Sequence, residues 1–151
     1  MVEITTGSTS DLKKIAAFNH SIFQSIYENE PYSLDQYQYR LKDVEPLIYL
    51  AEVDNKIVGN SISFVKDNSW YLWILGVHKD YRNKGLGTRL IELNELYAKN
   101  SKFEYIYTKV YNISKEMLRL LLNRGYYITN IDISDVNWKN NAIFLKKFLI
   151  D

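Results

Sequence analysis

Residues 75–90 are the part of the sequence best suited to chemistry, and they read LGVHKDYRNKGLGTRL. A strand-like apolar run gives way to a polar loop, and Gly85 and Gly87 then open a segment with helical periodicity. The first backbone N–H groups of a helix have no partner within it and lie at the positive end of its dipole, so a pyrophosphate can accept hydrogen bonds from them. Glycines leave room for such an anion, and Arg82 and Lys84 add positive charge. The stretch therefore predicts an anion-binding loop.

A loop that merely caps a helix is the simpler interpretation of two glycines. The complete order of strand, Arg-x-x-Gly-x-Gly, hydroxyl residue and apolar helix favours phosphate binding instead. The spacing matches neither a Walker A loop nor the Gly-x-Gly-x-x-Gly of dinucleotide-binding folds. There is no Gly-x-Ser-x-Gly for a serine nucleophile. His20 and His78 are isolated in the sequence, so we predict no metal site.

This segment resembles the GNAT superfamily of N-acetyltransferases. The family's signature is Gln/Arg-x-x-Gly-x-Gly/Ala, which residues 82–87 match. Residues 77–81 are similar to the family's lead-in, with Lys79 where many members have proline. The order of elements is similar over essentially the whole chain. The resemblance implies an α/β (α+β) fold, with a mixed, mostly antiparallel central sheet of about seven strands flanked by about four helices.

The resemblance also implies which residues would bind acetyl-CoA, the cosubstrate. The amides of residues 84–88 would hold the pyrophosphate. The backbone of residues 75–77 would pair with the pantetheine arm like an added strand, in a gap between the fourth and fifth strands. Asn112 matches an asparagine that commonly contacts the cofactor, and it could equally cap the following helix. The implied cofactor-binding residues are Leu75, Gly76, Val77, Arg82, Asn83, Lys84, Gly85, Leu86, Gly87, Thr88 and Asn112.

Two catalytic side chains common in the family are missing here. Many members protonate the leaving thiolate with a fourth-helix tyrosine, five residues before a glycine–aromatic pair, and this position is Leu121. Many also have a glutamate on the fourth strand, but residues 70–77 contain no carboxylate. Alignment of amine and thioester, with strand amides stabilising the oxyanion, can still supply much of the rate, and water could carry away the amine's proton. Tyr111 is then the candidate acid. Glu52 is the candidate relayed base, or simply an exposed strand residue.

Composition sets the wider limits. The 151 residues are 46% hydrophobic and 25% charged, which predicts one folded domain over residues 1–151. A net charge of +1 gives no broad electrostatic reason to expect nucleic acid or an anionic membrane as a partner. The absence of cysteine excludes a catalytic thiol and any disulfide. With no signal-like start and no long apolar run, the expected location is cytoplasmic.

Periodicity and turn residues predict the elements that must position these groups. We expect helices from Leu12 to a break at 29–31, at 34–41, after the glycines, and ending at Gly125. We expect strands at 2–6, 48–53, 57–65 with a bulge at Gly59, 70–77, 105–110, 126–131 and 142–149. Residues 8–11 predict a helix start, and the turns at 54–56 and 66–69 predict an antiparallel meander. The order is β-α-α-β-β-β-α-β-α-β-β.

The favoured function is transfer of an acetyl (acyl) group from acetyl-CoA to a primary amine within a ternary complex. The amine of a small molecule or a protein would approach opposite the cofactor, near residues 27–32 and the last two strands. Trp70, Trp73, Tyr105 and Tyr107 either stack a substrate or, preferably, pack the sheet. A homodimer through the final strands is compatible with the sequence. The alternatives are a non-catalytic acyl-CoA-binding sensor or interaction module, and a purely structural α/β domain.

Overall fold

The computed structural model describes residues 1–24, 26 and 31–149. Its helices and strands are β1 (Glu3–Thr6), α1 (Leu12–Phe23), α2 (Leu34–Leu41), β2 (Leu47–Val53), β3 (Lys56–Lys66), β4 (Ser69–Val77), α3 (Leu86–Asn100), β5 (Tyr105–Tyr111), α4 (Lys115–Asn123), β6 (Tyr127–Asp132) and β7 (Ala142–Phe148). Short 3₁₀ helices lie at η1 (Thr9–Asp11), η2 (Lys79–Tyr81) and η3 (Trp138–Asn140). The predicted order of elements is confirmed. The predicted break of the first helix falls mostly outside the described residues, and α1 ends at Phe23.

Local chemistry explains where several elements begin and end. Ser8 forms a capping box with Asp11 ahead of α1, and Ser33 forms one with Gln36 at the start of α2. The turns between β2, β3 and β4 each place two consecutive residues in the left-handed region, Asp54-Asn55 and Asp67-Asn68. Such turns match the twist of antiparallel strands. The predicted meander of β2, β3 and β4 is therefore confirmed.

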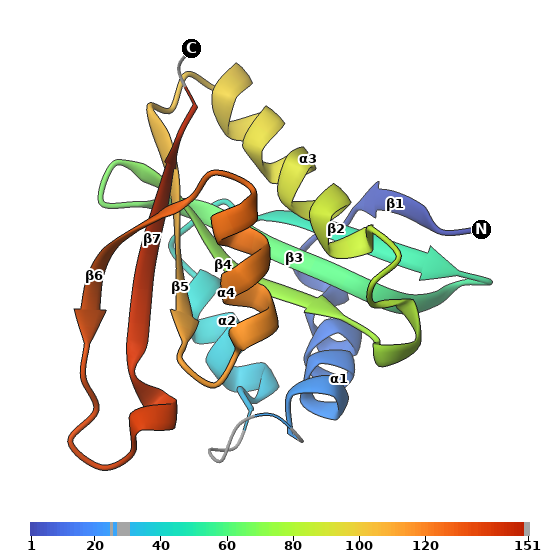
Figure 1. Ribbon diagram of the computed structural model, residues 1–151. Helices are drawn as coiled ribbons and strands as arrows, with labels where there is room; N and C mark the ends of the chain where they lie inside the picture. Colours follow the sequence, from blue (N-terminus) through green and yellow to red (C-terminus); the bar gives the residue numbers. More distant parts are fainter. Residues whose placement is uncertain (25, 27–30, 150–151) are drawn as a thin grey trace.

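The strands form one seven-stranded sheet in the order β1-β2-β3-β4-β5-β7-β6 (Figure 1). Among the described strands, β4 and β5 form the one parallel pair, and all other neighbours are antiparallel. The bulge predicted at Gly59 is present beside it, because Ala51 pairs with Gly59 and Glu52 pairs with Ile57, which leaves Val58 as the extra residue. The mixed, mostly antiparallel sheet is confirmed.

Helices cover both faces of the sheet. On one face α1 and α2 pack over β2, β3 and β4 around a core that includes Ile15, Leu41 and Ile62. On the other face α3 and α4 close a second core that includes Ile91 and Leu145. Figure 1 shows α4 in front of the central strands and α1 and α2 behind them. None of the helices within the described residues combines the length and apolar character of a membrane span.

Candidate active site

The β4 and β5 strands pair at one end only. The register runs Trp70–Ile106, Tyr71–Tyr107 and Leu72–Thr108, and then it stops. At the last pair the Thr108 hydroxyl, which is buried, donates a 2.8 Å hydrogen bond to the Leu72 carbonyl oxygen. From residue 73 onward β4 has no pairing with β5, so its backbone on that side is an open sheet edge. An open edge can accept an extended ligand as if it were another strand.

A bulge lies at the point where β4 leaves β5. Ile62 of β3 pairs with Ile74, while Ser63 pairs with Leu72, so Trp73 is the extra residue on β4. A bulge bends its strand and redirects side chains, and bulges are common beside active sites. The indole of Trp73 contacts the rings of Tyr32 and Tyr37 on the α1–α2 side of the sheet, with centroids 5.5 and 5.3 Å away.

A cavity of about 840 Å³ occupies the gap between the two strands. On the α1–α2 side it is lined by side chains such as Phe23, Tyr32 and Trp73. On the α3–α4 side it is lined by Gly87 and Leu120 among others. Because these helices cover opposite faces, the cavity crosses the sheet. Two molecules could therefore meet in it, each entering from a different face.

The predicted anion-binding loop lies at the α3 side of this cavity. Gly85, the residue before α3, has a φ of +83°, a conformation that glycine adopts without strain. No side chain caps the start of α3 within the described structure, so its first N–H groups remain available as donors. With the helix dipole, these donors form a site suited to phosphate oxygens.

The two basic residues of the loop are placed differently. Arg82 lines the cavity, and its Nε donates a 3.0 Å hydrogen bond to the Val77 carbonyl oxygen, which fixes the side chain at the end of β4. Lys84 does not line the cavity, and its ammonium lies 5.7 Å from the centre of the Tyr81 ring. The geometry thus brings the charge of Arg82, rather than that of Lys84, to the cavity wall.

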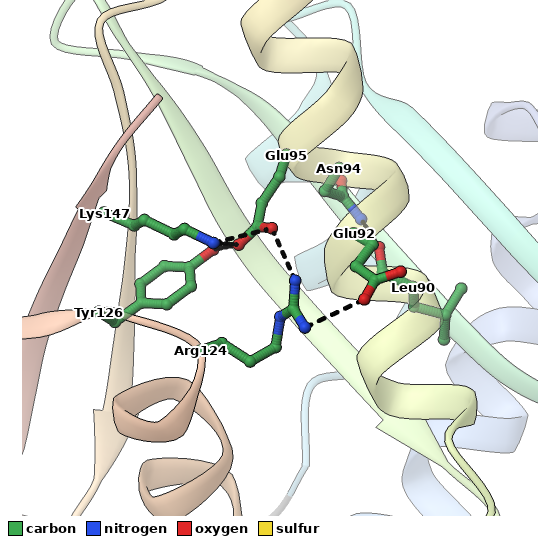
Figure 2. A network of polar contacts seen from close by, with 7 residues as sticks. All are labelled: Leu90, Glu92, Asn94, Glu95, Arg124, Tyr126 and Lys147. Atoms are coloured by element: carbon green, nitrogen blue, oxygen red, sulfur yellow. Dashed lines mark hydrogen bonds and ion pairs between the residues drawn. The ribbon is translucent and has the colours of Figure 1, made fainter. Parts of the chain in front are cut away.

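Buried polar contacts hold α3 in place. Asn94 donates to the Ser61 hydroxyl at 3.0 Å and accepts from the Ser63 hydroxyl at 2.6 Å, which ties the helix to β3. The same amide donates to the Leu90 carbonyl oxygen at 2.8 Å. The next residue, Glu95, contacts Arg124 and Tyr126, which approach α3 from a different side, as Figure 2 shows. The start of α3, and with it the loop, is thereby set against the sheet.

The structure gathers most of the predicted cofactor residues around the cavity. The lining includes Leu75, Gly76, Val77, Arg82, Asn83, Gly85, Gly87 and Thr88. Leu86 is buried in the core instead, and Asn112 and Lys84 lie outside the lining. The Asn112 side chain donates to the Trp138 carbonyl oxygen at 3.3 Å. The interpretation of Asn112 as a helix cap is wrong, because Ser114 is the residue before α4 and none of the described side chains caps that helix.

Of the two candidate catalytic residues, one lies at the cavity and the other does not. Tyr111, the last residue of β5, lines the cavity, as does the buried Leu121 of α4. Glu52 of β2 is not among the described lining residues, and its partners across the sheet are Glu3 and Ile57. Among the described residues that line the cavity, Glu116 is the one carboxylate, and it lies in the first turn of α4.

Sequence reasoning preferred to place Trp70, Trp73, Tyr105 and Tyr107 in sheet packing, and one of them, Trp73, also forms a cavity wall together with Tyr71. The Arg40 guanidinium lies 5.2 Å from the centre of the Trp73 ring, and Tyr71 stacks on Tyr107 with centroids 4.7 Å apart. Burial raises the pKa of Tyr71 to about 12, so its phenol is neutral near pH 7. Sequence reasoning offered substrate stacking as the alternative role of Trp73, but it did not single out Tyr71, and the placement of both residues depends on the bulge.

The α1 helix lies unusually close to β4. A Cβ on Gly76 would come within 2.7 Å of Ile22 Cδ1 and 2.9 Å of Asn19 Oδ1. The Asn19 side chain is fully buried, where it donates to the Tyr37 hydroxyl at 3.0 Å and accepts from Asn60 at 2.7 Å. These contacts set the wall of the cavity on the α1 side.

Comparison with known proteins gives a consistent result. Residues 12–126 match the sequence profile of the acetyltransferase (GNAT) family. A GNAT-family acetyltransferase from Staphylococcus aureus Mu50 is similar in structure, with a TM-score of 0.81, 18% identity, and coverage of 99% of this chain and 100% of that one. The ribosomal-protein-S18-alanine N-acetyltransferase of Escherichia coli has a TM-score of 0.80 at 18% identity, covering 99% and 94%.

A third similar structure is a putative streptothricin acetyltransferase from Bacillus anthracis in complex with acetyl coenzyme A. Its TM-score is 0.71 at 20% identity, with 100% of this chain and 99% of that one covered. At these low identities, the TM-scores show a shared fold and nothing more. The comparison with curated proteins finds no significant match. Because the family profile covers most of the sequence, the chain belongs to the acetyltransferase (GNAT) family.

Proposed function

We propose that the protein transfers an acetyl group from acetyl-CoA to a primary amine by direct attack within a ternary complex. The observation that carries this proposal is the cavity that crosses the sheet between β4 and β5. It has a loop suited to phosphate on one face and an aromatic wall on the other. Donor and acceptor could thus occupy it together, with the reacting atoms aligned.

The donor would enter from the α3–α4 side. The N–H groups at the start of α3 would bind the pyrophosphate, with Arg82 contributing charge. The pantetheine arm would lie along the open edge of β4, beside residues 75–77. Gly76 and its neighbours would offer backbone groups there in the manner of an added strand.

The chemical step has simple requirements. The neutral amine attacks the thioester carbon, the C–S bond breaks, and the thiolate leaves with a proton as the amine loses one. We assign the donation of that proton to Tyr111, the phenol at the end of β5 that lines the cavity, and solvent would then return a proton to the tyrosinate. Glu52 has no role in this proposal, since it lies outside the cavity lining, and water would accept the amine's proton. Activity should therefore rise with pH as the acceptor amine becomes neutral.

The test is release of coenzyme A thiol from acetyl-CoA, measured with a thiol reagent. The acceptor panel would contain peptide N-termini, lysine side chains, a polyamine and an amino sugar. We expect release that depends on one class of amine and exceeds hydrolysis without amine. Acetyl-CoA binding with no amine-dependent release anywhere in the panel would contradict the transferase.

If the protein binds acetyl-CoA but no amine causes thiol release, a second candidate function is an acyl-CoA sensor. The presence of Leu121 in the cavity wall favours this candidate. Leu121 is 1% exposed and cannot donate a proton. A sensor would bind acetyl-CoA and change its affinity for a partner without consuming the thioester. Turnover separates the two functions, whereas binding alone does not.

A further inference from the structure

The helices α3 and α4 meet at the predicted phosphate loop. α3 contributes Gly87 and Thr88 to the cavity lining, and α4 contributes Met117, Leu120 and Leu121. A Cβ built on Gly87 would lie 3.6 Å from Leu120 Cδ2, so the first turn of α3 directly faces α4. The separation of these two helices therefore sets the width of the cavity on this face.

Further along α3, a single carboxylate binds three side chains from the segments that follow α4. Glu95 accepts from Arg124 Nη2 at 3.2 Å, from the Tyr126 hydroxyl at 2.9 Å and from Lys147 Nζ at 3.2 Å. Arg124 also pairs with Glu92 of α3 at 3.0 Å. Figure 2 shows these groups converging on Glu95 from the end of α4 and from β7.

The Glu95 cluster is buried and charged. The Glu95 side chain is 10% exposed, and those of Arg124 and Lys147 are 24% and 26% exposed. Burial, and after it the charge of Glu95, raises the pKa of Tyr126 well above its usual value, so the phenol stays a donor. A buried ion pair adds little net stability compared with apolar packing, whereas removal of one partner is costly because the other charge stays behind. What the Glu95 cluster supplies beyond packing is a fixed geometry between the helices.

We propose that Glu95 is a positioning residue for the acyl-CoA cleft. By holding the end of α4 and β7 against α3, it fixes the distance between the phosphate loop and the α4 wall that includes Leu120. This inference rests on the proposed function, since it concerns how the cleft accepts its donor. Asn94 ties the same helix to β3 on the other side, so the two neighbouring residues set α3 against the sheet and against α4 separately.

The experiment compares the wild type with Glu95→Gln, which keeps the shape of the side chain and removes its charge. A substitution at Ile48, in the core under α1 and α2, is the control. Either Ile48→Val or Ile48→Ala is used, whichever matches the urea midpoint of Glu95→Gln. Two quantities are measured: the affinity for acetyl-CoA by calorimetry, and hydrogen–deuterium exchange of the free protein over residues 82–90 and 115–121.

We expect Glu95→Gln to weaken acetyl-CoA binding by at least about tenfold, because a small displacement of the loop before α3 relative to α4 would misalign the groups that bind the ligand. Exchange should rise in both segments, while the Ile48 control changes neither quantity. Affinity and exchange equal to those of the control would overturn the proposal. If Glu95→Gln does not fold, Lys147→Met, which removes one of the two cations, is measured in the same way. If the wild type does not bind acetyl-CoA, the proposed function fails, and the exchange measurement still decides the role of Glu95.

Discussion

Thr108 of β5 donates its hydroxyl to the carbonyl oxygen of Leu72 on β4, at the last pair before the two strands separate. The hydrogen bond is 2.8 Å long, and Thr108 is 6% exposed. The Thr108 side chain thus supplies a hydrogen-bond donor to the Leu72 carbonyl oxygen at the point where the two strands part. The cavity that crosses the sheet begins directly beyond this pair, and both residues line it.

Thr108→Val should destabilise the protein by about 1–3 kcal/mol, the cost of leaving a buried carbonyl without a donor. Urea unfolding of the free protein measures it. Thr129→Val is the matched control, because the Thr129 hydroxyl also donates to a strand carbonyl, that of Phe144, but in an exposed position. Water can replace that donor, so the control should change little. Equal effects of the two substitutions would contradict the role given to Thr108.

Gly76→Ala should destabilise by about 1–3 kcal/mol, because the added methyl group overlaps α1 at Ile22 and Asn19. Gly87→Ala provides the contrast. Its methyl group would make ordinary contacts with Leu120 and Val77, at 3.6 and 3.9 Å. Alanine also suits a helix better than glycine, by up to about 1 kcal/mol. The midpoint temperature of thermal unfolding should therefore fall in Gly76→Ala and rise in Gly87→Ala, both measured without ligand. A higher midpoint for Gly76→Ala would contradict the close packing of α1 on Gly76.

Stability should fall at alkaline pH. Burial raises the pKa of Tyr71 to about 12, while an unfolded tyrosine titrates near about 10. Between these values the unfolded chain loses the proton and the folded chain keeps it, so the free energy of unfolding falls by on the order of 2 kcal/mol over this window. Tyr71→Phe should make this decline shallower, and Tyr39→Phe, at an exposed site, should not. Identical pH profiles for wild type and Tyr71→Phe would refute the assignment.

Tyr111→Phe should lower kcat by about a hundredfold, with little change in the KM for acetyl-CoA, if its phenol protonates the thiolate. Tyr107→Phe is the control, since Tyr107 lies on the same strand but outside the described cavity lining. Glu52→Gln should retain turnover. Full activity of Tyr111→Phe would show that Tyr111 is not the acid, and water would then protonate the thiolate.

Local patterns predicted much of the fold. The cap at Ser8 and the turns at 54–56 and 66–69 come from residues adjacent in the sequence, so they were recognised there. The same holds for the loop around Gly85, whose conformation and position before an apolar helix are both local features. This is why the element order, and the glycine loop that opens α3, could be predicted.

The rest of the site depends on contacts between distant segments. The extra residue at Trp73 is defined only by its register with β3, and nothing in the β4 sequence marks it. The cluster around Glu95 joins residues 29 to 52 positions apart. The alternation of apolar and polar residues shows that Glu52 belongs to a strand. It does not show how far Glu52 lies from the cavity. For this reason sequence analysis preferred sheet packing for Trp73, and it missed both Tyr71 and the contacts of Glu95 between the helices.

The central claim is that the start of α3 binds the pyrophosphate of acetyl-CoA, and calorimetric titration tests it most directly. Wild type is compared with Gly87→Trp, whose side chain would occupy the cavity between Val77 and Leu120, and with Gln38→Trp at an exposed position on α2. We predict that wild type and Gln38→Trp bind acetyl-CoA with the same affinity and that folded Gly87→Trp does not bind it. Absence of binding by the wild type, or unchanged binding by Gly87→Trp, would contradict the account.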